Sequence, residues 1–360
     1  MRRVPLIVLG VGQVGSAFLA QLLHVRGHLQ ARYAVDLCPV ALADSSGVLF
    51  DANGVSDHDL KVLLAQKAAR VHLGEQPGAL EAMYARELVA YAAGQGVEEA
   101  IVVDATAAAG MEPALRHALE IGYGVVLANK RPLAGAWEDS RIFFEHPRAQ
   151  FEATVGGGLP VLATLRAMVD TGDRVERIEG ALSGTLGYLC SRLEDGEAFS
   201  VIVGAAKARG YTEPDPREDL SGVDVARKML ILGRTAGWSL ELGNLTVDPL
   251  YPSAMAEMSV EDFMSALPRL DSDFAAYIGA LAGVPRYLAE IGPEGGLVSL
   301  RMVGERLAAQ LRGRLNQVTF WTQLYHDRPL TISGPGIGRE NAAAALLRDC
   351  LQLARTAAQR

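Results

Sequence analysis

The sequence predicts an α/β fold, in which a doubly wound parallel sheet is followed by a second α+β domain with a mixed sheet. The length of 360 residues corresponds to about two domains of roughly 150 residues each. In the first half, short apolar runs alternate with stretches of helical periodicity. The apolar runs are nearly continuous, which is typical of parallel strands covered by helices on both faces.

The first expected element is a strand at residues 4–9, an apolar run in which Pro5 lies near the beginning. Residues 14–23 follow with apolar side chains spaced by three and four, which predicts a helix. Residues 112–121 show helical spacing as well, and Gly122 is suited to end that helix. Further strands are expected at 40–43, 100–103 and 125–128.

A triple glycine at residues 156–158 marks the passage to the second half of the chain. We expect a first domain over residues 1–150 and a second over residues 151–330. Residues 331–360 are expected to return to the first domain as a helix. The expected strands of the second sheet are 175–182, 298–303 and 314–321. The expected helices are 162–170, 199–209, 223–235, 260–267 and 341–357.

Composition excludes several classes of protein. Hydrophobic residues make up 49% of the chain and charged residues 21%, which excludes a disordered polypeptide. A net charge of −8 argues against general nucleic-acid binding, which needs a basic surface. No apolar stretch reaches the ~18 residues needed to cross a membrane, so no membrane partner is expected. Because Cys38, Cys190 and Cys350 form no CxxC pair, we expect a reducing, cytoplasmic compartment and no zinc cluster.

Gly10, Gly12 and Gly15 form a GxGxxG pattern between the first strand and the first helix. This context predicts a dinucleotide-binding turn of the Rossmann type. The first glycine permits the tight turn, the second lets the backbone approach a pyrophosphate, and the third lets the helix pack closely. Gln13 and Val14 open the helix, whose N-terminal amides face the anion. The alternative is a glycine-rich strand-to-helix turn without a ligand.

An acidic residue at the end of the second strand would bind the ribose 2′-hydroxyl of such a cofactor. Asp36 has the usual spacing from the glycine turn, but Asp44 ends the better strand and is the preferred candidate. Ser45 and Ser46 follow Asp44 with no adjacent arginine, so we predict NAD, with NADP as the alternative. Either aspartate could instead serve only to form a turn.

Residues 210–228 form the most unusual segment, because they contain five acids and two prolines. Asp224 and Lys228 are four residues apart and therefore share one helix face. Apolar neighbours flank the lysine stem, and a desolvated lysine loses its charge more readily, which suits proton transfer. The competing interpretation is a solvated acidic loop and a surface ion pair that contributes little.

Taken together, seven blocks of the sequence resemble homoserine dehydrogenase. In chain order they are GVGQVGSAFLAQL, VDAT, ANKRPL, EATVGGGLPV, LSGTLGYL, GYTEPDPREDLSGVDVARKMLIL and GPGIG. The short segment after Gly338 resembles the monofunctional form of the family, without a kinase or an ACT domain. One departure is Gly187, where many members have Asn or Ser.

The resemblance implies the reversible NAD(P)H-dependent reduction of L-aspartate 4-semialdehyde to L-homoserine, on the route to threonine, methionine and isoleucine. With the residues singled out above, it implies two sets of contacts. Those to the cofactor are Gly10, Gly12, Gln13, Val14, Gly15, Asp44, Thr106, Lys130 and Gly336. Those to the substrate are Gly184, Thr185, Tyr211, Glu213, Asp219, Asp224 and Lys228.

Among these residues, Lys228 oriented by Asp224 is the first candidate to protonate or stabilise the alkoxide that hydride transfer leaves. Lys130 is the second candidate. The resemblance also implies a monovalent cation, Na⁺ or K⁺, bound largely by main-chain oxygens. The residues implied for this site are Glu152, Val155, Gly157 and Leu159.

Two rival interpretations remain: a related Rossmann dehydrogenase acting on another amino acid, and a regulatory protein that senses NAD(P) without turning over an aldehyde. Only the first would share the chemistry of hydride transfer. We also expect a homodimer through the second domain, in which the strands at 298–303 and 314–321 could extend a sheet across a two-fold axis.

Overall fold

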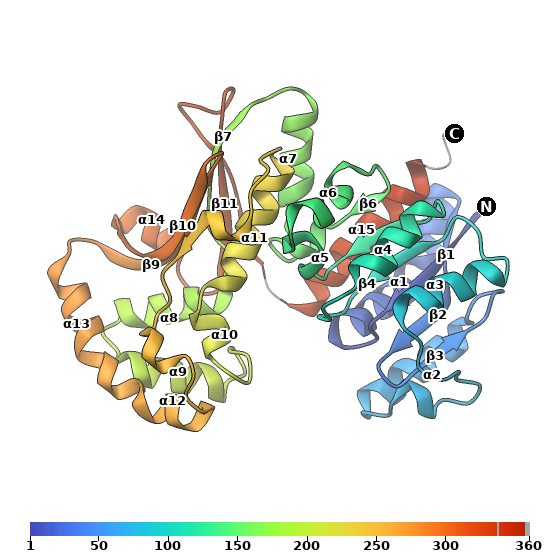
Figure 1. Cartoon of the computed structure of the whole chain (residues 1–360), viewed down its shortest axis with the longest axis horizontal. Coiled ribbons are helices and arrows are strands. Elements are labelled where there is room, and N and C mark those ends of the chain that lie inside the picture. Colours follow the sequence, from blue (N-terminus) through green and yellow to red (C-terminus); the bar gives the residue numbers. More distant parts are fainter. Residues whose placement is uncertain (337, 357–360) are drawn as a thin grey trace. The chain divides into compact units, whose positions relative to one another are not determined.

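The computed structural model describes residues 1–336 and 338–356, which form two compact units (Figure 1). Unit 1 comprises Met1–Gly158 together with the segment that begins at Gly338, and unit 2 comprises Leu159–Ile337. Residue 357, where the last helix was expected to end, lies outside the described residues.

Unit 1 contains a six-stranded sheet in the order β3-β2-β1-β4-β5-β6. The neighbouring strands pair in parallel, except that β3 runs antiparallel to β2. The strand order reverses between β1 and β4, which confirms the predicted doubly wound architecture. The strands are β1 Arg2–Leu9, β2 Val35–Asp44, β3 Gly47–Phe50, β4 Ile101–Asp104, β5 Gly124–Leu127 and β6 Ala149–Gln150.

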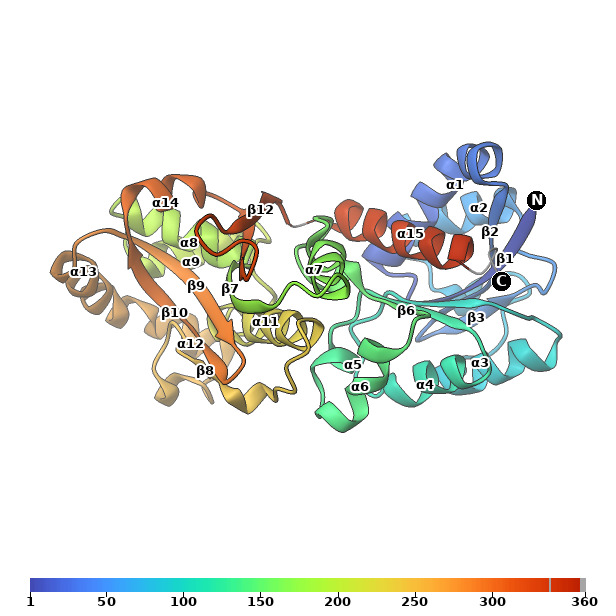
Figure 2. The same ribbon diagram turned by 90° about the horizontal axis from the view of Figure 1, so that it is seen from above.

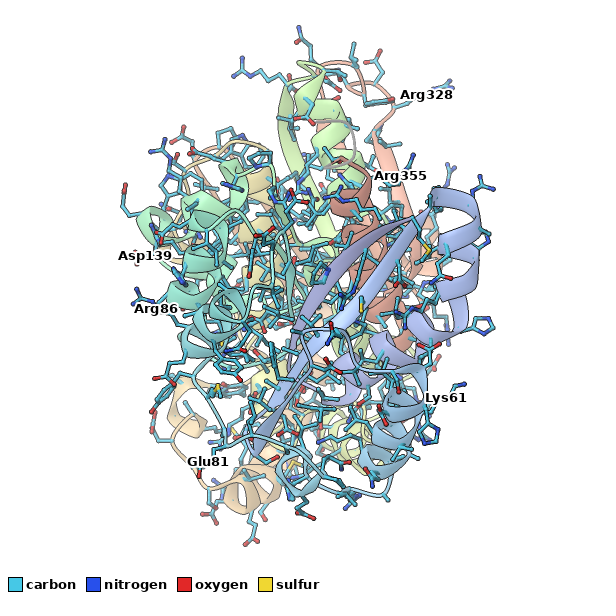
Figure 3. The ribbon with its side chains drawn as sticks, turned by 90° about the vertical axis from the view of Figure 1, so that its right-hand side faces the viewer. Lys61, Glu81, Arg86, Asp139, Arg328 and Arg355 are labelled. Carbon is cyan, nitrogen blue, oxygen red and sulfur yellow. The ribbon has the colours of Figure 1, made fainter. Side chains whose placement is uncertain are left out.

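Helices cover both faces of this sheet (Figure 2). They are α1 Gln13–Tyr33, α2 Asp57–Ala68, α3 Ala85–Gly94, α4 Glu112–Glu120, α5 Arg131–Ala134, α6 Trp137–Glu145 and α15 Arg339–Thr356. Helices α1, α2 and α15 lie on one face and α3 to α6 on the other. Exposed Lys61 of α2 therefore lies across the sheet from Arg86 of α3 and Asp139 of α6 (Figure 3).

Helix α15 belongs to the core of unit 1, although it is the last element of the chain. Its side chains of Leu346 and Cys350 are fully buried in the same hydrophobic cluster as Phe18 of α1. The Asp349 carboxylate on the same helix accepts a 2.9 Å hydrogen bond from the Glu152 amide. The tail of the chain thus stabilises both the first helix and the segment that leaves the sheet.

Unit 2 contains a second six-stranded sheet, in the order β12-β11-β7-β9-β10-β8. Its strands pair antiparallel except for β10 with β8, so the predicted mixed sheet is confirmed. The strands are β7 Val175–Ala181, β8 Leu245–Val247, β9 Val284–Gly292, β10 Gly295–Val303, β11 Leu315–Thr322 and β12 Leu330–Pro335. Strand β11 is paired on both sides, whereas β8 pairs with β10 only at residues 296–298, and the extension of this sheet across a two-fold axis stays a prediction.

The helices of unit 2 are α7 Val161–Asp170, α8 Gly184–Glu194, α9 Phe199–Ala208, α10 Arg217–Leu220, α11 Val223–Thr235, α12 Val260–Ala266, α13 Asp271–Ala280 and α14 Glu305–Gln310. Two of them begin at points that matter for the site. Helix α8 begins after Ser183, whose hydroxyl accepts a 3.1 Å bond from the Leu186 amide. Helix α11 begins after Gly222, where φ is +72° and a Cβ would lie 2.0 Å from the Tyr287 hydroxyl, so only glycine fits. None of the described helices is both long and apolar enough to cross a membrane.

Candidate active site

The glycine turn of unit 1 has the geometry that a dinucleotide cradle requires. Gly10 has a φ of +91°, and a Cβ there would lie 2.8 Å from Thr106 Cγ2. A Cβ on Gly15 would lie 1.9 Å from the Gly10 carbonyl oxygen, so the missing side chain is what lets α1 approach the turn. At Gly12, by contrast, no described atom lies within 4 Å of the Cβ position. The turn therefore leaves open space in front of the N-terminus of α1, where an anion would bind.

Asp44 lies beside this turn, because the Gly10 amide donates a 2.8 Å hydrogen bond to the carbonyl of Ala43. Its carboxylate accepts bonds from the amide and hydroxyl of Ser46, at 2.8 and 2.5 Å, and forms an ion pair with Lys67 Nζ at 2.7 Å. Partial burial would raise the pKa of Asp44, but the bonds from Lys67 and Ser46 outweigh it and hold this pKa below its usual range. Lys67 was not predicted from the sequence, because it is 23 positions away in α2.

Asp36, the alternative acid, lies at the opposite end of β2, where it is aligned with Arg3 near the start of β1. Its carboxylate pairs with Arg26 at 2.7 Å and accepts a bond from Gln30 at 3.0 Å. The carboxyl ends of β1 and β2 carry the glycine turn and Asp44, so the topology places Asp36 away from the turn.

Thr106 belongs to a network with Asp104 and Asn129 that the sequence did not predict. Its amide and hydroxyl both donate to Asp104 Oδ1, at 3.0 and 2.7 Å, and Asn129 Nδ2 donates to the other carboxylate oxygen at 3.1 Å. Burial raises the pKa of the fully enclosed Asp104 carboxyl, although the bonds from Thr106 and Asn129 oppose it. Lys130 follows Asn129 directly and is the N-cap of α5, so the network fixes where the lysine backbone lies.

The residues expected to bind a cation lie at the end of unit 1. Glu152 is 6% exposed, Val155 is buried, and the next two glycines, Gly156 and Gly157, have φ values of +75° and +67°. Leu159 is the first residue of unit 2. Among the described residues, no three His, Cys, Asp or Glu side chains are grouped to hold a metal ion.

In unit 2 the polar block at residues 210–228 folds against the N-terminus of α8. The Thr185 hydroxyl donates a 2.6 Å bond to the Tyr211 carbonyl, and Asp219 Oδ2 accepts a 2.8 Å bond from the Glu213 amide. Burial raises the pKa of Asp219, and the neighbouring charges of Glu213 and Asp224 raise it further, against bonds from the Glu213 amide and Thr185. Three carboxylates thus share one site, which we call the acidic site (Thr185, Glu213, Asp219, Asp224 and Lys228).

Lys228 is the cation of the acidic site. Its Nζ lies 2.8 Å from Asp224 Oδ2 and donates a 2.7 Å bond to the carbonyl of Leu182, directly before α8. The lysine side chain is 15% exposed, whereas that of Asp224 is 42% exposed. Gly184 is the first residue of α8, so the Leu182 carbonyl that binds the lysine ammonium lies two residues before the start of this helix.

Two expected residues occupy other positions in unit 2. Gly336 packs against buried Asn316, whose amide donates a 3.2 Å bond to the Gly336 carbonyl. Gly187, the departure from the family pattern, lies inside α8 with the Gly313 carbonyl oxygen 2.6 Å from its Cβ position. A larger side chain at residue 187 would displace that loop.

A doubly wound sheet with a glycine turn, joined to a unit that holds a lysine among carboxylates, defines the class of Rossmann-type oxidoreductases. Residues 160–351 match the model of the homoserine dehydrogenase family. The homoserine dehydrogenase of Saccharomyces cerevisiae is 32% identical over 370 residues, which cover 98% of each chain. The chain belongs to the homoserine dehydrogenase family.

One further relative agrees with this assignment, and one solved structure shows the same fold. A chloroplastic bifunctional aspartokinase/homoserine dehydrogenase of Zea mays is 34% identical over 367 residues, covering 96% of this chain and 38% of the plant protein. The chain therefore spans well under half the length of that relative. A hyperthermophilic archaeal homoserine dehydrogenase in complex with NADPH has the same fold, with a TM-score of 0.76, 20% identity and coverage of 98% and 97%.

Proposed function

We propose that the protein catalyses the reversible reduction of L-aspartate 4-semialdehyde to L-homoserine with a nicotinamide dinucleotide. The observation that carries this proposal is the acidic site, where the Lys228 ammonium is held 2.8 Å from Asp224, and the charges of Asp224 and Glu213 both act on Asp219. The substrate that is reduced, L-aspartate 4-semialdehyde, is an amino acid with an aldehyde group. Its ammonium needs carboxylates, and its aldehyde oxygen needs a proton donor. The acidic site supplies both.

The residues of the glycine turn fit a dinucleotide. The open space at Gly12 and the close approach of Gly15 to Gly10 support a pyrophosphate at the N-terminus of α1. Gln13 and Val14 begin that helix, and Asp44 and Thr106 flank the turn. When bound, the nicotinamide supplies the hydride that is added to the aldehyde carbon.

The chain's own residues bind and orient the substrate and move its proton. Glu213 and Asp219 attract the substrate ammonium, and the start of α8 at Gly184 and Thr185 offers main-chain and hydroxyl groups to the rest of the amino acid. The Lys228 ammonium gives a proton to the oxygen that becomes the hydroxyl of homoserine. Asp224 holds Nζ in place for that transfer. Lys130 remains the second candidate for the donor.

The test is a spectrophotometric assay of the purified full chain. We expect NADH absorbance to fall when L-aspartate 4-semialdehyde is added and to rise when L-homoserine is supplied with NAD. A sensor of NAD(P) would bind nucleotide without this turnover, and a dehydrogenase for another amino acid would leave both substrates unchanged. Either result would contradict the proposed reaction.

Asp44 and Lys67 set the choice between NAD and NADP in this proposal. We expect Asp44→Ala to lower kcat/KM for NAD by about tenfold to hundredfold, because a charged hydrogen bond to the ribose is lost. The same change frees Lys67 to pair with a 2′-phosphate, so the NADP-to-NAD ratio of kcat/KM should rise. Asp36→Ala is the matched control, since that acid pairs with Arg26 instead. An equal change of the ratio in both variants would exclude Asp44 as the ribose ligand.

We also propose that main-chain oxygens around Glu152, Val155, Gly157 and Leu159 bind Na⁺ or K⁺. The buried positions of Glu152 and Val155 and the left-handed turn at Gly156 and Gly157 support this, because hard cations are bound by oxygen ligands, backbone carbonyls among them. Exchange of all alkali cations for tetramethylammonium should lower activity, and Na⁺ or K⁺ should restore it. Unchanged activity in tetramethylammonium would remove the cation from the proposal.

A homodimer formed through unit 2, in a cytoplasmic compartment, completes the proposal. The exposed side chains of Leu297 in β10 and Leu315 in β11 support an interface on this unit. The three cysteines are free and buried, which suits a reducing compartment. Light scattering of the purified chain should give twice the 38.3 kDa mass of one chain. A monomeric mass at micromolar concentration would contradict the dimer.

A further inference from the structure

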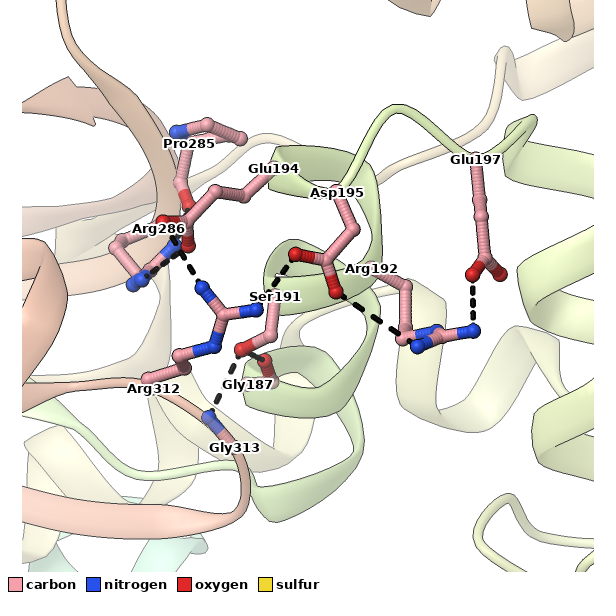
Figure 4. A network of polar contacts seen from close by, with 10 residues as sticks. All are labelled: Gly187, Ser191, Arg192, Glu194, Asp195, Glu197, Pro285, Arg286, Arg312 and Gly313. Carbon is pink, nitrogen blue, oxygen red and sulfur yellow. Dashed lines mark hydrogen bonds and ion pairs between the residues drawn. The ribbon is translucent and has the colours of Figure 1, made fainter.

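The loop at residues 311–314, which we call the Arg314 loop, is fastened to α8 at several points (Figure 4). The Gly313 amide donates a 2.8 Å bond to Ser191 Oγ, and the Gly313 carbonyl occupies the space left by the absent side chain of Gly187. Arg312 forms ion pairs with Glu194 at 3.3 Å and Asp195 at 2.5 Å. The N-terminal end of α8 carries Gly184 and Thr185, and Thr185 belongs to the acidic site. The same helix therefore holds both the Arg314 loop and part of the acidic site.

Among the residues that the structure describes, Arg314 has no acidic partner, unlike its neighbour Arg312. Its guanidinium carbon lies 4.0 Å from the centre of the Tyr211 ring, a cation–π contact. Its Nε is buried and meets no hydrogen-bond acceptor, and no described carboxylate pairs with the guanidinium. A half-buried guanidinium in this state is a ready site for an anion, since stacking fixes its plane and leaves its N–H edge unpaired.

Tyr211 connects this cation to the acidic site. Its carbonyl accepts the 2.6 Å bond from Thr185, and its ring packs edge-on against Tyr188 of α8, with centres 5.3 Å apart. Tyr211 therefore contacts Arg314 through its ring and Thr185 through its backbone carbonyl.

The charges of the acidic site leave one requirement of the substrate unmet. Its three carboxylates suit an ammonium, but an amino acid also carries an α-carboxylate, which they repel. Lys228 is already engaged with Asp224 and the Leu182 carbonyl. We propose that Arg314, stacked on Tyr211, binds the α-carboxylate of the substrate and so selects amino acids over simple amino alcohols. This inference rests on the reaction proposed above.

The experiment compares two ligands that differ only in the carboxylate. L-homoserine carries it, and 3-aminopropan-1-ol has the same amine and hydroxyl without it. In Arg314→Gln we expect KM for L-homoserine to rise about tenfold to hundredfold with kcat changed less than about twofold. The inhibition constant of 3-aminopropan-1-ol against L-homoserine should stay within about twofold of the wild-type value. Arg314→Lys should recover part of the lost affinity, because it restores the positive charge.

Arg328→Gln is the matched control, because Arg328 is an exposed arginine of the same unit that lies outside the Arg314 loop and the acidic site. It should leave KM for L-homoserine near the wild-type value. Equal weakening of both ligands in Arg314→Gln would mean that Arg314 only positions Tyr211, and an unchanged KM would mean that it does neither; both results overturn the proposal. A wild-type protein that binds no L-homoserine by calorimetry would instead refute the proposed reaction itself.

Discussion

Lys228→Ala should lower kcat for homoserine oxidation by about 10²–10⁴-fold, the usual contribution of a positioned acid–base group. Nucleotide affinity should change little, because the substitution leaves the glycine turn and Asp44, which would hold the dinucleotide, unaltered. The lysine side chain is 15% exposed, and Asp224 and the Leu182 carbonyl hold its ammonium in place. We therefore expect no other side chain to take over its role. Steady-state rates and fluorescence titration with NADH measure the two quantities.

Lys61→Ala is a suitable control for this substitution, because Lys61 is an exposed lysine of α2. It should leave kcat unchanged. Lys130→Ala separates the two candidate donors, since Lys130 follows the Asp104–Asn129 network in unit 1. Near-normal turnover of Lys228→Ala, together with an inactive Lys130→Ala, would transfer the role of proton donor to Lys130.

The fold class followed from the sequence because the elements of unit 1 have simple patterns. Strands such as β4 and β5 are buried along their whole length and read as continuous apolar runs. The end of α4 was also predicted, since Gly122 takes the left-handed conformation with a φ of +85°. Helix α1 extends to Tyr33, ten residues beyond its expected end. The prediction stopped early because only Leu29 is buried in the second half of the helix, where the apolar periodicity fades.

The second sheet was predicted less completely. Strand β9 was not anticipated, because Pro285 and Arg286 interrupt the apolar alternation that marks a half-buried strand. Arg286 is nevertheless 2% exposed, since it pairs with Glu194, which lies 92 positions earlier. A pairing over such a separation leaves no local signal in the sequence.

The same reason explains what was missed in the site. Glycine spacing and the Asp224–Lys228 interval are local features, and they pointed to the turn and to the acidic site. Lys67 reaches Asp44 only because β2 and α2 pack together in the fold. Arg314 reaches Tyr211 only through the fastening of its loop to α8. The sequence shows that such charged residues are present, but it does not show which residues they contact. Their roles follow only from the three-dimensional structure.

Asp219→Asn should weaken substrate binding and stabilise the folded protein at neutral pH. Loss of a charged partner for the substrate ammonium should raise KM for L-homoserine about tenfold to hundredfold. Burial and the charges of Glu213 and Asp224 raise the pKa of Asp219 in the folded state. The protonated form is thus favoured by folding, so its contribution to stability is complete below the unfolded pKa of about 3.9 and is lost as pH rises through the folded pKa. An asparagine mimics the protonated form at every pH.

Asp215→Asn is the matched comparison, because Asp215 is an acid of the same segment whose pKa is shifted in the opposite direction. Hydrogen bonds from Arg217 outweigh burial and lower the pKa of Asp215, so its contribution is present above the unfolded pKa and is lost as pH falls. Thermal melts between about pH 4 and pH 8 should therefore show Asp219→Asn melting above wild type and Asp215→Asn below it at neutral pH. Both differences should shrink towards the acidic end. If Asp219→Asn melted below wild type at neutral pH, the acidic site would not hold the repelling carboxylates that attract an ammonium, and the proposed substrate contact would lose its physical basis.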